Sequence, residues 1–115
     1  MSVVISGTGL FTPEEYITNE ELVESFNGYV ESFNKENQDA IDLGKVDPLT
    51  PSSTEFIKKA SGIEKRYVLD KTGILDISRM KPQLKSRDNS DLSVQAEMAV
   101  KASKDALDLA NIDSS

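Results

Sequence analysis

The side chains best suited to binding chemistry form one cationic cluster in an otherwise acidic chain of net charge −7. The cluster consists of Lys58, Lys59, Lys65 and Arg66. Lysine and arginine bind phosphate groups, and the nearby ring of Phe56 offers a face on which a base can stack. Cations at the end of a helix are also stabilised by its dipole and by water. From the residues alone, a solvated surface is the favoured interpretation and phosphate docking is the alternative.

Catalytic chemistry is restricted because the chain contains no cysteine and no histidine. A thiol nucleophile, a thiolate metal site and the commonest general base are therefore excluded from it. The adjacent carboxylates Glu14-Glu15 and Glu20-Glu21 point in different directions and do not form an acid/base pair. The acidic residues between 39 and 47 lack the spacing of a calcium loop. We expect neither a catalytic residue nor a metal site here.

A short strand at the start of the chain is the first element that the sequence predicts. Residues 3–5 are β-branched and lie before the turn Gly7-Thr8-Gly9, which is typical of a strand buried on both faces. A dinucleotide-binding turn needs a third small residue and an immediate helix start. Thr12 occupies that third position, and the helix signal comes only at Thr18. A structural turn is therefore the better interpretation.

A long helix is predicted from Thr18, because Thr18 and Glu21 have the spacing of a capping box. One face of this helix is apolar and is formed by Leu22, Phe26, Tyr29, Val30 and Phe33. The opposite face is polar and is expected to point outward, with Glu24, Asn27, Glu31 and Asn34. The spacing of the apolar residues predicts that their face packs against another element.

The middle of the chain alternates between loops and short elements. Residues 37–51 read as a long irregular connection. Ser52 and Glu55 repeat the capping-box spacing, and Gly62 is suited to the left-handed position at a helix end. A short helix is therefore expected between Ser52 and Gly62. Residues 65–69 predict a strand, and residues 70–90 predict a charged surface loop.

The last predicted element is a helix over residues 92–111. Its alanines fall on one stripe and are Ala96, Ala99, Ala102, Ala106 and Ala110. Small side chains in register allow another helix to approach closely. Alanine is also the strongest helix former, so helix propensity alone explains the same residues. Both interpretations are open at this point.

The size and charge of the chain limit its function further. At 115 residues it is one domain or part of one. A net charge of −7 argues against a nucleic-acid partner, which requires a surplus of Lys and Arg. No apolar run reaches the ~20 residues that cross a bilayer, and no basic segment precedes an apolar one at the N-terminus. We expect no membrane span and a cytoplasmic location.

Three motifs in a fixed order carry a family resemblance. They are IxGxGxxxP from Ile5, TNEEL from Thr18 and GIEKRY from Gly62, followed by a charged loop and the alanine-rich helix. In this order they resemble the N-terminal part of β-ketoacyl-acyl-carrier-protein synthase III, a condensing enzyme of the thiolase superfamily. The resemblance covers nearly the whole chain except residues 28–51, which form a probable insertion, and parts of the charged loop at 70–90.

The resemblance implies an α/β fold, in which residues 1–115 are the N-terminal fragment of a thiolase-like αβαβα domain. This fragment would contain a short strand, three helices and long loops. The parent enzyme would be an acyltransferase that catalyses decarboxylative Claisen condensation of an acyl thioester with malonyl-acyl-carrier protein in fatty acid biosynthesis. The family's catalytic Cys, His and Asn lie beyond this region, so the fragment alone is expected to be inactive.

The resemblance also implies where a thioester would bind. Phe56 takes the place of a family Trp at the coenzyme A entrance, and Arg66 matches an Arg of that site, whereas Ala60 replaces another. With the neighbouring Lys58 and Lys59, these residues are the candidates for contacting coenzyme A or phosphopantetheine, which is a substrate and not a tightly bound cofactor. Acyl carrier protein and acyl-CoA are the implied partners, and a homodimer the implied assembly.

Two other functions are consistent with the sequence. One is a fragment of a different thiolase-superfamily condensing enzyme, since the loss of charge at Ala60 alters the usual entrance. The other is a stand-alone acidic protein-interaction module that binds a partner through an exposed helix face.

Overall fold

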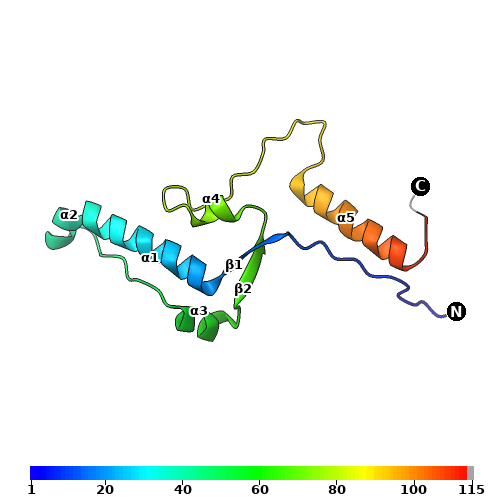
Figure 1. The fold of residues 1–115 in the computed structure, drawn as a ribbon, viewed down its shortest axis with the longest axis horizontal. Helices are drawn as coiled ribbons and strands as arrows, with labels where there is room; N and C mark the ends of the chain where they lie inside the picture. Colours follow the sequence, from blue (N-terminus) through cyan, green and yellow to red (C-terminus); the bar gives the residue numbers. More distant parts are fainter. Residues whose placement is uncertain (114–115) are drawn as a thin grey trace. The chain divides into compact units, whose positions relative to one another are not determined.

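A computed structural model of the protein describes residues 1–113, which divide into two compact units (Figure 1). One unit combines residues 1–12 with the chain from residue 85 onward, and the other comprises residues 13–84. Within the described residues there are two strands and five helices, compared with the two strands and three helices expected from the sequence. No helix among them is both long enough and apolar enough to cross a bilayer.

The larger unit contains a two-stranded antiparallel sheet formed by β1 (Glu15–Thr18) and β2 (Lys65–Val68). Its register pairs Tyr16 with Tyr67, Ile17 with Arg66 and Thr18 with Lys65. Ile17 is only 1% exposed, because its side chain points away from solvent in this pairing. The strand predicted at residues 65–69 is confirmed, whereas its partner β1 was not predicted.

Helix α1 (Asn19–Glu36) follows β1 directly and begins as the sequence predicts. The Thr18 hydroxyl accepts a hydrogen bond from the Glu21 amide at 3.2 Å, and the Glu21 carboxylate accepts one from the Thr18 amide at 3.0 Å. This is the complete capping box. Val30, in the apolar face of the helix, is 3% exposed. The predicted packing of that face is confirmed at this position.

Two expectations for the segment after α1 are wrong. The connection at residues 37–51 is not wholly irregular, because α2 (Gln38–Asp42) lies within it. The cap of α3 (Thr54–Ser61) is Ser53 and not Ser52, since the Ser53 hydroxyl accepts from the Phe56 amide at 3.2 Å. The Ser52 backbone is hydrogen-bonded to the Asn27 side chain of α1, and the helix begins one residue later than expected. The end of α3 is as predicted, with Gly62 left-handed at φ 71°.

The segment at residues 70–90 was predicted as a loop, and the structure changes this in part. Helix α4 (Lys71–Leu75) occupies its start. Gly73 in this helix is buried, and a Cβ atom there would lie 2.7 Å from the Lys81 carbonyl oxygen. The chain after α4 therefore folds back over the helix, which only a residue without a side chain permits.

The smaller unit contains α5 (Val94–Leu109), which confirms the helix predicted at residues 92–111. Residues 1–12 run alongside it (Figure 1). A Cβ atom at Gly9 would lie 2.7 Å from the Ala106 amide nitrogen, and one at Gly7 would lie 3.0 Å from Ala110 Cβ. The alanine stripe does have a close neighbour, but this neighbour is an extended segment and not the helix that was expected.

The buried strand predicted at residues 3–5 is wrong for this structure. Val3, Val4 and Ile5 are 95%, 77% and 87% exposed. No backbone hydrogen bond joins them to another described residue. A β-strand is stabilised by pairing with a neighbour, and residues 1–113 supply none at this position. The apolar pattern of a strand is present here without the sheet that would bury it.

Candidate functional site

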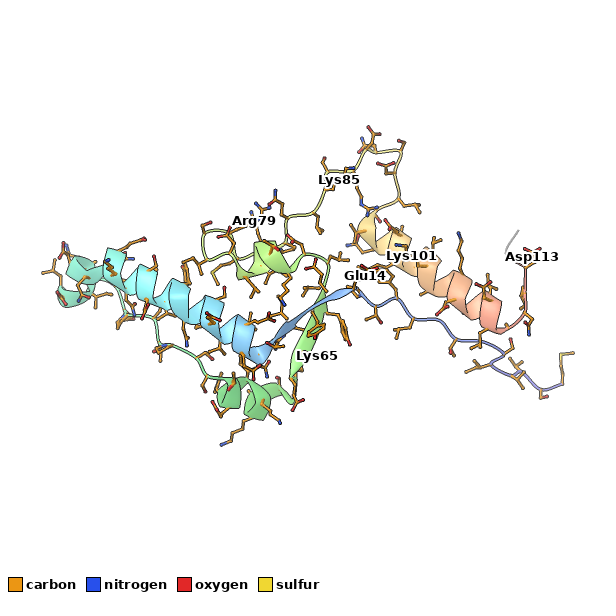
Figure 2. The ribbon with its side chains drawn as sticks, in the orientation of Figure 1. Glu14, Lys65, Arg79, Lys85, Lys101 and Asp113 are labelled. Carbon is orange, nitrogen blue, oxygen red and sulfur yellow. The ribbon has the colours of Figure 1, made fainter. Side chains whose placement is uncertain are left out.

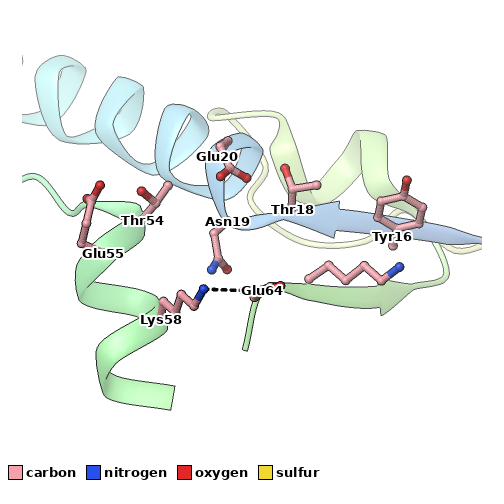
Figure 3. A pocket seen from close by; sticks show the side chains of 9 residues that line it. Tyr16, Thr18, Asn19, Glu20, Thr54, Glu55, Lys58 and Glu64 are labelled. Carbon is pink, nitrogen blue, oxygen red and sulfur yellow. Dashed lines mark ion pairs between the residues drawn. The ribbon is translucent and has the colours of Figure 1, made fainter. Parts of the chain in front are cut away.

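A polar cleft of about 620 Å³ lies where the start of α1, the helix α3 and the two strands meet (Figure 3). Its walls are formed by Tyr16, Thr18, Asn19, Glu20, Thr54, Glu55, Lys58, Glu64 and Lys65. Most of these residues belong to the two motifs TNEEL and GIEKRY or adjoin them in the sequence. The two motifs, which are separated by the 39 residues between Leu22 and Gly62, thus meet at one place in the fold.

Asn19 adds hydrogen bonds between the two motifs to the strand pairing of Thr18 with Lys65. It is 4% exposed, and its side-chain amide donates a hydrogen bond to the Ile63 carbonyl oxygen at 2.7 Å. Its side-chain oxygen accepts from the Arg66 guanidinium at 3.3 Å, and its backbone amide donates to the Glu64 carbonyl oxygen at 3.1 Å. A buried amide requires this kind of saturation. Asn19 therefore fixes the exit of α3 and the start of β2 against α1.

Lys58 faces the cleft but is already paired. Its ammonium lies 2.6 Å from the Glu64 carboxylate, and this hydrogen bond raises the pKa of Lys58 and lowers the pKa of Glu64 (Figure 3). Both side chains are well exposed, so the pair adds little to stability. Its effect is on charge, because a phosphate approaching Lys58 meets a carboxylate beside it.

Lys65 has a different environment, formed by two aromatic rings. Its ammonium lies 4.7 Å from the centre of the Tyr16 ring and 5.3 Å from that of Tyr67, and the two rings are themselves edge to face. Figure 2 labels Lys65 among the side chains of the fold. Cation–π contacts of this kind hold an ammonium group at the rim of a site. The cleft therefore contains two cations, but Glu20, Glu55 and Glu64 outnumber them.

The predicted cationic cluster is not brought together as one site. Lys58 lines the cleft, whereas Lys59 and Phe56 on the same helix do not. Phe56 is 65% exposed, so its ring is available on the outer face of α3. Arg66 is half-buried and hydrogen-bonded to Asn19, which lines the cleft, but Arg66 is not itself one of the lining residues. Of the four candidate binding residues, the structure places three on α3 and ties the fourth to the fold.

The sequence analysis missed the residues that build the cleft around Asn19. Asn19 was read only as part of a family motif, and Tyr16 and Glu64 were not considered for binding. The available signal was the polar residue immediately after a helix cap, although such a residue is usually solvated. Its burial results from the strand pairing of Thr18 with Lys65, which brings the two motifs together.

An apolar groove of about 300 Å³ lies on another side of α1. It is lined mainly by Leu22, Val23, Phe26, Ile57, Ile74 and Met80. It receives part of the apolar face predicted for α1. No group of three or more potential metal-binding side chains comes together anywhere in residues 1–113.

Comparison with known proteins identifies one informative similarity. No protein-family model matches the chain. Over 85 residues, 74% of its length, the chain is 47% identical to a protein of Pseudomonas aeruginosa named beta-ketodecanoyl-acyl-carrier-protein synthase. The matched part is 24% of that protein, so the chain spans about a quarter of the length of its relative. The predicted resemblance to a condensing enzyme of this kind is thereby confirmed.

Proposed function

Because the chain is related to part of a β-ketoacyl-acyl-carrier-protein synthase, we propose that it forms a structural segment of such an enzyme, in a thiolase-like domain. The reaction proposed for the whole enzyme is decarboxylative condensation of an acyl thioester with malonyl-acyl-carrier protein in fatty acid biosynthesis. The acyl group passes to a cysteine thiolate, and a new carbon–carbon bond forms as the malonyl group loses carbon dioxide. These activities are proposed for the enzyme and not for these 115 residues alone.

The observation that carries this proposal is the junction at Asn19. TNEEL and GIEKRY are two of the three motifs on which the resemblance rests, and Asn19 of the first bonds to Ile63 and Arg66 of the second. Residues that support a family resemblance in sequence are thus also linked physically.

The segment has a supporting role in the proposed enzyme. It contains no Cys and no His, so the nucleophile and its base must come from other parts of the protein. The exposed Val3, Val4 and Ile5 agree with this role, because an unpaired β-branched run is suited to join a sheet whose other strands lie elsewhere. We propose that this run is the first strand of the thiolase-like sheet.

Within this enzyme, α3 is the proposed contact for the thioester substrate. Phe56 presents an exposed ring for stacking, and Lys59 on the same helix is the proposed contact for the phosphates of coenzyme A or phosphopantetheine, to which Lys58 contributes when it is released from Glu64. Arg66 has a different part in the proposal, since its bond to Asn19 holds it at the base of the site. Acyl carrier protein and acyl-CoA as partners, a homodimer and a cytoplasmic location complete the proposal.

A chimeric enzyme tests the function. The segment of the Pseudomonas aeruginosa relative that matches this chain is replaced by the chain, and formation of β-ketodecanoyl-acyl-carrier protein is measured by mass spectrometry. We expect the chimera to form product and the 115-residue chain alone to form none. A matched chimera carrying Lys59→Ala is expected to need more acyl thioester for half-maximal rate. A folded chimera without activity would contradict the proposed function and favour an interaction module.

A further inference from the structure

Two asparagine side chains of α1 form hydrogen bonds with the backbone of the segment that leads into α3. The Asn27 side-chain amide donates to the Ser52 carbonyl oxygen at 3.0 Å, and its oxygen accepts from the Ser52 amide at 2.8 Å. Asn34 does the same with Leu49, at 2.9 Å and 2.8 Å. Each side chain thus saturates both backbone groups of one residue. The expectation that Asn27 and Asn34 point outward into solvent is wrong.

The distance between the two asparagines along α1 matches the distance between their two partners along the extended segment. Asn27 and Asn34 are seven residues apart on a helix, which corresponds to about 10.5 Å along its axis and nearly two full turns. Leu49 and Ser52 are three residues apart on an extended chain, which spans about 9–10 Å. Pro51 favours extended backbone at the residue before it and donates no hydrogen bond itself. The helix and the extended segment therefore match over two consecutive anchor points.

These anchor points determine where α3 begins. Ser52 immediately precedes Ser53, the cap of α3, and the other end of α3 is held through Ile63 by Asn19. The helix itself contains no buried residue. Apart from Ile57 in the apolar groove, α3 has little core to hold it, so polar contacts at its two ends contribute strongly to its position.

We propose that Asn27 and Asn34 are positioning residues that hold α3 at a fixed place on α1. This role rests on the proposed function where it concerns substrate, because α3 carries Phe56, Lys58 and Lys59. Asn34 and Leu49 lie within the predicted insertion at residues 28–51, so part of that insertion has a structural role. That segment is then a braced extension of α1 and not a free surface loop.

Amide hydrogen exchange in the unaltered protein gives the first test. The Leu49 and Ser52 amides donate to asparagine side chains, whereas the Thr50 amide between them, in an exposed residue, donates to no described residue. After correction for intrinsic rates, we expect exchange about fivefold or more slower at Leu49 and Ser52 than at Thr50. Equal exchange at the three positions would overturn the proposal without any substitution that endangers folding.

Distance measurement between two spin labels gives the second test. The chain has no cysteine, so the pair Lys35→Cys and Lys59→Cys on exposed positions of α1 and α3 labels uniquely. We expect one narrow distance distribution, which Asn27→Ala combined with Asn34→Ala broadens or shifts while helix content is kept. Asn37→Ala is the matched control, because the side-chain amide of Asn37 donates to the Phe33 carbonyl oxygen in the last turn of the same helix and forms no hydrogen bond with the described residues 49–52.

The outcomes separate this proposal from the proposed function. An unchanged narrow distribution in the folded double variant would overturn the positioning role. This distance distribution does not depend on substrate binding, because the sample contains no acyl thioester. An inactive chimera would instead contradict the enzymatic function, whatever the distance between α1 and α3. In an active chimera, the double variant is expected to raise KM for the acyl thioester with kcat retained.

Discussion

Replacement of Asn19 by alanine is expected to weaken the fold of residues 13–84 more than any change on its surface. The substitution removes a short hydrogen bond to Ile63 and a longer one from Arg66, and leaves the backbone bond to Glu64 in place. A side-chain hydrogen bond contributes about 0.5–1.5 kcal/mol, and one to a charged group contributes more when it is short. The expected loss in the free energy of unfolding is therefore about 2 kcal/mol.

Urea unfolding followed by circular dichroism measures this loss, and a thermal melt is expected to shift downward by about 10 °C. Asn19→Asp is the informative comparison, because aspartate keeps the acceptor for Arg66 and loses the donor to Ile63. Its stability should be no higher than that of Asn19→Ala, because a buried carboxylate oxygen would replace the donor that lies 2.7 Å from the Ile63 carbonyl oxygen. If Asn19→Ala changed the free energy of unfolding by less than about 0.5 kcal/mol, a typical surface effect, the junction would not be what joins the two motifs.

Two further predictions concern the other unit and the dependence on pH. Gly9→Ala places a Cβ atom 2.7 Å from the Ala106 backbone, so limited proteolysis within residues 1–12 should become faster. Gly28→Ala is the control, because its Cβ atom would have its nearest neighbour at 3.7 Å and the proteolysis rate should stay unchanged. Equal rates in both variants would refute the close packing. The Glu21 pKa is lowered, mainly by its hydrogen bond with Lys71. The Glu21 carboxylate therefore stabilises the fold at pH values above the ordinary glutamate pKa, and this stabilisation is lost as pH falls through the lowered pKa of the folded state. Glu21→Gln should accordingly make the melting temperature fall less steeply with decreasing pH.

Local signals in the sequence predicted local structure well. The Thr18 and Glu21 pair locates the start of α1 because the capping box depends only on residues three apart. Gly62 marks the end of α3 for a similar reason, since glycine adopts the left-handed conformation without strain. Neither feature requires knowledge of a distant residue.

Features that depend on distant partners were predicted less well. Val3, Val4 and Ile5 have the composition of a buried strand, but a strand needs a neighbour that residues 1–113 do not provide. β1, in contrast, has a short mixed sequence that becomes a strand because β2 lies beside it. Pattern alone indicates the capacity to form a strand and not the presence of its partner.

The candidate site shows the same limit. The cations on α3 were found from composition, but their pairing was not, because Glu64 reaches Lys58 only after the chain turns at Gly62. Asn27 and Asn34 were assigned to the solvent-facing side of α1 from helical periodicity. Their contacts arise because residues 49–52 return along that side of the helix. Periodicity identifies the polar face and does not reveal what covers it.

The mass and full sequence of the protein purified from its natural cells test the central claim most directly. The account predicts a chain several times longer than these 115 residues, in which the remainder supplies a cysteine, a histidine and an asparagine for condensation. It also predicts that this longer protein forms a β-ketoacyl-acyl-carrier protein. A native protein with the mass of these 115 residues alone, bound to no partner chain that supplies those groups, would contradict the account.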